Sequence, residues 1–320
     1  HKTVDIPASR LKTDITKISA VKFIILLGIV SLFADMTYEA ARSITGPYLS
    51  LLGASAAAVG FIAGLGELIG YTLRLVSGYI SDKTHKYWFI TILGYTINLL
   101  AVPLIALAGH WWIAAGLILA ERFGKAVRVP ARDAMLSQAS GKVGFGWGFG
   151  LHEAMDQIGA LLGPIIVILV LYFKGGYRTS FAILFIPAVL AISILLLAKY
   201  LYPNPQDLEI KTLKLETKGF SKIFWLYIVA IGLIAAGYVD FPIIAYHFKK
   251  MSLVSDTWIP IFYAVAMGTD AVAALILGKL FDKIGISIMI FVSFISLFFA
   301  PLVFLGGFYF ALLGMILWGV

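Results

Sequence analysis

Ionisable side chains lie inside long apolar segments of this chain, where a charge is costly and needs a reason. In the first of these segments, Asp35 is followed by Glu39 at i+4 and by Arg42 at i+7. On an α-helix these spacings place the three side chains on one face. We expect that face to line a polar cavity, in which a desolvated carboxylate could take up and release a proton.

A second polar stripe is predicted in the fifth apolar segment. His152 and Asp156 share one helix face with Gly159 and Gly163, and Glu153 lies beside that face. The ionisable half could face the same cavity, with His152 passing protons to Asp156. A buried, hydrogen-bonded histidine without such a role is an equal alternative. The glycine half would let a neighbouring helix pack closely.

The fourth apolar segment carries mostly basic side chains at helical spacing. Glu121, Lys125, Arg128 and Arg132 recur along it, and Arg122 lies among them. Two interpretations remain open. Glu121 could pair with Lys125 or Arg128 and so hold helices together, or the arginines could bind an organic anion.

The remaining ionisable groups within apolar segments are few. Glu67 and Arg74 share a helix face in the second segment and are expected to pair. In the second half of the chain, Asp240 is predicted at about the depth of Asp35, so that each half would supply one carboxylate to a central cavity. For Asp270, a structural role is expected nearly as much as a role in the cavity.

The elements that carry these residues must span a membrane. Hydrophobic residues make up 61% of the chain and charged residues 13%, which is far from the composition of a soluble domain. Each apolar segment approaches the ~20 residues with which an α-helix crosses a bilayer, which is too long for a barrel strand. We therefore predict an all-α polytopic membrane protein. Its segments lie near residues 21–49, 56–80, 88–108, 111–126, 146–173, 181–201, 223–247, 258–280 and 286–305, with a tenth from Gly307.

Basic residues predict the orientation. Lys and Arg are concentrated in alternate connections, beginning with the N-terminal segment, so the N-terminus is predicted to be cytoplasmic in the cell membrane. This pattern accounts for the net charge of +8 without a nucleic-acid partner. The chain has no cysteine, which excludes disulfides and thiol chemistry. With no phosphate-binding loop and no metal-ligand spacing, we expect neither an enzyme, a cofactor nor a metal site.

A short signal occurs twice and predicts a duplicated unit. Gly-x-x-x-Asp-Lys is present at Gly78, Asp82 and Lys83 and, 200 positions later, at Gly278, Asp282 and Lys283. We predict a cytoplasmic segment at 1–20, a six-helix bundle at 21–201, a connector at 202–221 and a second bundle at 222–320. That second bundle would hold helices seven to nine and the start of the tenth, so about two and a half helices would be missing from a faithful repeat.

These features resemble the major facilitator superfamily of secondary transporters, whose fold is two six-helix bundles related by a pseudo-two-fold axis. The family's loop signature matches at Gly78, Asp82, Lys83 and Lys86, and departs from it at His85. A further departure is Tyr87, where the family has a second cation.

A second family signature, Gly-x-x-x-Gly-Pro on the fifth helix, is similar to Gly159, Gly163 and Pro164. In the family it is associated with antiporters. Arg122 stands where the family's fourth helix carries its arginine.

The resemblance implies a proton-coupled secondary transporter that works by alternating access on a small-molecule substrate, as a monomer in the lipid bilayer. Export by antiport is the first expectation. Protonation of Asp35 or Asp156 would weaken its pairing with Arg42 or Arg122 and shift the balance between outward and inward states. Two alternatives stay open: uptake of an organic anion bound by Arg42, Arg122 and Arg128, and a membrane sensor without transport.

The repeated turn is expected to act as a conformational latch between the two bundles. Asp82, with Lys83, Lys86 and the Arg132–Asp133 pair, would form a charge cluster near the cytoplasmic surface. For the two lysines, a solvated loop that only fixes topology is an equal alternative.

Overall fold

The computed structural model describes residues 8–204, 221–237 and 258–320, together with Ile244, Phe248, Met251 and Leu253. All regular elements in these residues are helical, as predicted. The chain divides into two compact units, which we call unit 1 (1–209) and unit 2 (210–320) and describe separately. Asp240 lies outside the described residues.

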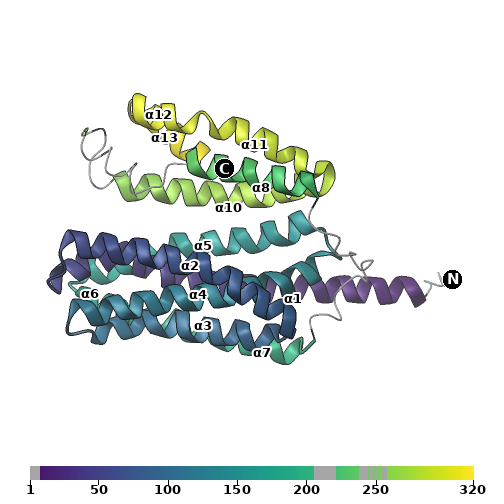
Figure 1. Ribbon diagram of the computed structural model, residues 1–320, viewed down its shortest axis with the longest axis horizontal. Helices are drawn as coiled ribbons and strands as arrows, with labels where there is room; N and C mark the ends of the chain where they lie inside the picture. Colours follow the sequence, from purple (N-terminus) through teal and green to yellow (C-terminus); the bar gives the residue numbers. More distant parts are fainter. Residues whose placement is uncertain are drawn as a thin grey trace, which may run out of the picture. The chain divides into compact units, whose positions relative to one another are not determined.

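Unit 1 is a bundle of helices that run alternately up and down (Figure 1). A short 3₁₀ turn at Ile105–Leu107 follows α3, and α6 and α7 together form one apolar helical stretch, Tyr177–Leu201. The helices are α1 (Ala8–Leu51), α2 (Ala56–Thr84), α3 (Tyr87–Leu104), α4 (Trp111–Ser140), α5 (Phe145–Tyr172), α6 (Tyr177–Ile183) and α7 (Phe185–Leu201).

Helix α1 begins earlier than the apolar pattern predicts. It starts at Ala8 rather than near Val21, and its first part extends beyond the rest of the bundle (Figure 1). No glycine or proline occurs between Ala8 and Leu27, so nothing in this stretch interrupts the helix. Much of the predicted polar segment 1–20 is therefore helical.

Glycines set the close contacts between helices of unit 1. A Cβ on Gly163 of α5 would lie 2.9 Å from the backbone nitrogen of Ala40 on α1. On α3, a Cβ on Gly94 would lie 2.6 Å from the backbone nitrogen of Arg128 on α4. No side chain fits at such distances, so α1 meets α5, and α3 meets α4, backbone to backbone. The predicted close packing at the glycine half of α5 is confirmed.

Membrane-length apolar helices make up most of unit 1. Among the described residues, six helical stretches are long and apolar enough to cross a bilayer, five of them in unit 1. Helix α4 does not meet this criterion although it has 30 residues, because charged side chains occupy its middle. Its buried face includes Gly124, Ala126, Arg128 and Ala131, so the most polar helix of unit 1 has its charges inside the bundle.

Unit 2 is also helical where it is described, and an aromatic cluster lies in its core. The rings of Phe248, Phe262 and Phe308 meet edge to face, with the Phe262 and Phe308 centroids 5.3 Å apart. Its helices are α8 (Lys222–Gly237), α10 (Trp258–Ile284), α11 (Ile288–Ser296), α12 (Phe299–Leu305) and α13 (Phe308–Trp318).

Both copies of the repeated signal lie in the last turns of a long helix. Gly78 and Asp82 lie in the last two turns of α2, which ends at Thr84, and Gly278 and Asp282 lie in the last two turns of α10, which ends at Ile284. Both copies thus belong to the end of a helix rather than to the turn that follows it.

Candidate functional site

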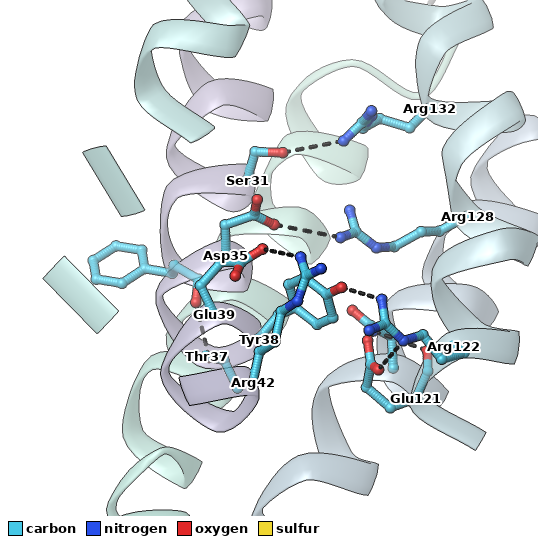
Figure 2. Close-up of polar contacts among 12 residues, drawn as sticks. Ser31, Asp35, Thr37, Tyr38, Glu39, Arg42, Glu121, Arg122, Arg128 and Arg132 are labelled. Carbon is cyan, nitrogen blue, oxygen red and sulfur yellow. Dashed lines mark hydrogen bonds and ion pairs between the residues drawn. The ribbon is translucent and has the colours of Figure 1, made fainter. Parts of the chain in front are cut away.

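Three arginines project from α4 toward the polar face of α1 (Figure 2). Arg128, the middle one, is fully buried, and its Nη2 lies 3.8 Å from an oxygen of Asp35, whose side chain is 9% exposed. The predicted pairing of Asp35 with Arg42 or Arg122 is therefore wrong. Arg42 lies at i+7 from Asp35, about two turns along the same helix, and its guanidinium group does not reach the Asp35 carboxylate.

Arg42 instead pairs along its own helix. Its Nη1 lies 3.6 Å from Glu39, at the i,i+3 spacing, and its side chain is 45% exposed. Glu39 is largely buried. Because Arg42 is half-exposed, this pair marks the more open end of the polar face of α1.

Asp156 of α5 joins Asp35 in the interior of the bundle. The carboxyl groups of Asp156 and Asp35 lie close enough to interact directly, and they repel each other when both are ionised. One turn earlier on α5, the buried His152 lies close enough to Arg128 and Arg132 to interact with their positive charges. The structure thus brings together the carboxylates of the first and fifth predicted segments.

Arg122 forms the centre of a second charge cluster. Its guanidinium group lies 3.3 Å from Glu67 on α2 and 3.6 Å from Glu121 on its own helix, and it donates a hydrogen bond to the hydroxyl of Tyr38. The expected pairing of Glu67 with Arg74 is therefore wrong, because the face of α2 that bears Glu67 is turned to α4.

Glu121 is buried against α3. Asn98 donates hydrogen bonds to the Glu121 carboxylate at 2.7 Å and to its backbone carbonyl at 3.0 Å. Glu121 was expected to pair with Lys125 or Arg128, but its hydrogen-bond partner is a neutral amide from another helix. Lys125 points to the ring of Tyr38, with its ammonium nitrogen 3.7 Å from the ring centroid.

Arg128 has an aromatic neighbour besides Asp35. Its guanidinium carbon lies 4.2 Å from the centroid of the Tyr95 ring on α3. Within the described part of the chain, none of its three guanidinium nitrogens has a hydrogen-bond partner, and neither has the Tyr95 hydroxyl.

Of the residues predicted to form a latch, Arg132 and Asp133 lie at the site, whereas those at the end of α2 are exposed. Arg132 and Asp133 pair at 2.7 Å, and Arg132 also donates to Ser31 on α1 at 3.2 Å (Figure 2). Asp82, Lys83 and Lys86 are exposed where α2 gives way to α3.

Gly78 was expected to permit a close helix approach. A Cβ there would lie 3.5 Å from Pro130 of α4, an ordinary van der Waals distance. The contact between α2 and α4 at this point therefore does not require glycine.

The other predicted residues of α5 have local roles in the described structure. Glu153 accepts a hydrogen bond from Gln157 one turn later. Pro164 lies inside α5, directly after the glycine that contacts α1. Asp240, the predicted carboxylate of the second half, falls outside the residues that the structure describes.

Three residues of the site were missed by sequence reasoning: Tyr38, Tyr95 and Asn98. Each places a polar atom in an apolar helix, and Tyr38 lies at i+3 from Asp35. That spacing could have identified Tyr38. For Tyr95 and Asn98 the only signal was a polar group in a segment otherwise suited to lipid.

Comparison with known proteins places the chain in one family. The model of the Major Facilitator Superfamily matches residues 25–320. An uncharacterized protein of Mycobacterium tuberculosis is 35% identical over 322 residues, covering 98% of this chain and 79% of the relative. An uncharacterized MFS-type transporter of Methanocaldococcus jannaschii is 29% identical over 275 residues, covering 82% of this chain and 67% of the relative.

The fold is also similar to a solved structure. A crystal structure of the nucleoside transporter NupG superposes with a TM-score of 0.60 at 15% identity, over 93% of this chain and 78% of that chain. At this identity the likeness concerns the fold alone.

Proposed function

This chain belongs to the major facilitator superfamily, and from that premise we propose a proton-coupled secondary transporter whose coupling site is the Asp35–Asp156 pair. It is an integral membrane protein of a transporter family, and its substrate is a small molecule. The single observation that carries the proposal is the buried Asp35 carboxylate, which lies 3.8 Å from the buried Arg128 and beside the carboxyl group of Asp156.

The pair has the properties that proton coupling requires. Two neighbouring carboxylates repel each other, and a proton that binds between them relieves the repulsion. Arg128 lies on the other side of Asp35, at 3.8 Å. Gain or loss of the shared proton therefore changes the attraction that α4 exerts on α1 and α5.

In this mechanism protonation selects between conformations. In the family's fold two bundles rock about a central site and open it alternately to either side. A proton can shift that equilibrium only by binding one conformation better than the other. We propose that the arrangement with Asp35 turned to Arg128 is favoured when the pair is less protonated, and that protonation releases it.

The direction that we propose is export by antiport. It rests on the resemblance at Gly159, Gly163 and Pro164, and it is supported by the position of both glycines against α1, the helix that carries Asp35. The alternative, uptake together with protons, differs in the sign of the coupling and is distinguished by the same experiment.

Proton flux in liposomes tests the proposal. A thermal-shift screen of small organic compounds on the purified protein first supplies a ligand. The protein is then reconstituted with a pH-sensitive dye inside the vesicles, and the ligand is added outside. Antiport predicts that protons leave as the ligand enters, whereas symport predicts that both enter.

Variants of the pair supply the control. Asp156→Asn is expected to bind the ligand but to move no protons, and Asp156→Glu, which keeps an ionisable group, to retain part of the flux. Ligand movement without any proton flux in the wild type, or an unchanged flux in both Asp35→Asn and Asp156→Asn, contradicts the proposal.

We also propose a monomer in the cell membrane with its N-terminus in the cytoplasm. The charge asymmetry of the connections supports this orientation. Because the chain has no cysteine, a single cysteine introduced at Lys86 would report its side directly. A membrane-impermeant thiol reagent should label it only after the cells are opened, and labelling in intact cells would reverse the orientation.

A further inference from the structure

We infer that the transported substrate carries an anionic group, a carboxylate or a phosphate, and that this group binds to Arg128. The inference rests on the proposed function, because it names the substrate class of the same site. It adds a specific residue and a specific ligand chemistry.

Arg128 has donors without acceptors. Its side chain is 0% exposed, yet Nε, Nη1 and Nη2 have no hydrogen-bond partner among the residues that the structure describes. A buried guanidinium group without hydrogen bonds is costly, and proteins rarely leave one so. The planar fork of an arginine matches two oxygens of a carboxylate or phosphate.

Asp35 does not fill this role in the present arrangement. Its oxygen lies 3.8 Å from Arg128 Nη2, which is beyond hydrogen-bonding distance. The Asp35 carboxyl group is also engaged with Asp156. Asp35 therefore attracts the guanidinium group but leaves its N–H donors available.

The neighbours of Arg128 hold it in position without using those donors. The Tyr95 ring lies 4.2 Å from the guanidinium carbon, and a ring stacked on the guanidinium face leaves the in-plane N–H groups free. Gly94, the residue before Tyr95, contacts the backbone of Arg128 directly. The backbone contact and the stacked ring together pre-organise the group for a ligand.

The charged groups around Arg128 are largely paired with one another. Arg132, one turn later, is neutralised by Asp133 at 2.7 Å, and Glu39 is paired with Arg42. Lys125, one turn earlier, stacks on Tyr38 and lies near Asp35. Lys125 and Arg128 face Asp35, and Glu121 also interacts with both cations. The charged groups balance one another, so the inference rests on the N–H donors of Arg128 rather than on an excess charge.

Anion binding to the full-length protein in detergent tests the inference. The melting temperature is measured in increasing inorganic phosphate, succinate or benzoate, each against sodium chloride at the same ionic strength. A ligand that binds only the folded state raises the melting temperature by an amount that grows with the logarithm of its concentration relative to its dissociation constant. At least one of the three oxyanions is expected to stabilise the wild type above chloride.

Substitutions at Arg128 locate the site. Arg128→Gln is expected to weaken the apparent affinity roughly 10- to 100-fold, the range for a lost charge-assisted contact. Arg128→Lys should lie between, since it keeps the charge and loses the fork. The matched control is Arg178→Gln, at a helix start where the side chain contacts only the Ala108 carbonyl in the described structure, and it should respond like the wild type.

Asp35→Asn provides an independent test of the site if the Arg128 variants do not fold. It removes the carboxylate that competes for Arg128, so the oxyanion should bind more tightly than to the wild type. Because this assay measures no protons, anion binding to a wild-type protein that moves no protons would contradict the proposed coupling alone.

Three outcomes would overturn the inference. The first is that no oxyanion stabilises the wild type more than chloride. The second is that Arg128→Gln responds to the oxyanion as the wild type does. The third is that only phosphatidylglycerol added to the micelles protects, which would make the anion a lipid headgroup rather than a soluble substrate.

Discussion

The charged residues on α4 have separate partners. Arg122 contacts two glutamates, Arg132 contacts the adjacent aspartate, and Arg128 contacts a ring and a distant carboxylate. Besides its contact with Arg122, Glu121 accepts a hydrogen bond from a neutral amide, that of Asn98. In a low-dielectric interior, a charge that loses its partner costs more than the contact itself contributes. Stability and ligand binding in unit 1 should therefore respond strongly to single polar substitutions.

Asn98→Leu is expected to lower the free energy of unfolding by about 1–3 kcal/mol, because the buried Glu121 carboxylate loses its donor. Equilibrium unfolding of the purified protein in mixed detergent micelles measures it. Combining the change with Glu121→Gln should cost less than the two single changes added together. Strict additivity would show that the hydrogen bond contributes nothing to stability.

At the level of elements, unit 1 depends on two backbone contacts that position the charges. The meeting of α1 with α5 sets Asp35 beside Asp156, and the meeting of α3 with α4 sets Tyr95 under Arg128. Both contacts occur at glycines. The geometry of the site therefore depends on residues that carry no chemistry of their own.

Gly159→Ala is expected to destabilise the protein by about 1–3 kcal/mol, since its Cβ would lie 2.8 Å from the carbonyl carbon of Leu32 on α1. Gly60→Ala in α2 is the matched control: nothing lies within 4 Å of its Cβ, and alanine in a helix interior should be neutral or stabilising by up to about 1 kcal/mol. The same unfolding assay compares them. Equal effects of the two substitutions would contradict the close contact of α5 with α1.

At the level of the whole molecule, the repeated signal lies at the C-terminal end of one long helix in each unit. Asp82 and Asp282 each lie near the C-terminus of a long helix, α2 and α10, where an anion opposes the helix dipole. Such a position is unfavourable by itself. We propose that it is retained because these residues latch the bundles in one conformation.

Asp82→Asn is expected to increase the share of the inward-facing conformation, because it removes the latch charge. Single cysteines introduced along α4 into this cysteine-free chain would report the change as faster labelling from the cytoplasmic side. The control is Thr84→Ala, whose hydroxyl bonds only to its own helix and the adjacent turn in the described structure. Equal labelling of both variants and the wild type would favour a solvated loop.

The amino-acid sequence by itself determined the helical membrane-spanning class, the duplicated signal and the family, because length, hydropathy and short motifs are local properties. It also identified Asp35, Asp156 and the glycines of α5 as residues of the inward-facing sides of their helices, since helical periodicity determines which side chains share a face. Only the tertiary structure decided which charges meet. Asp35 contacts Arg128 and not Arg42, and Glu67 contacts Arg122 and not Arg74, because partners across helices depend on the depth and rotation at which the helices pack.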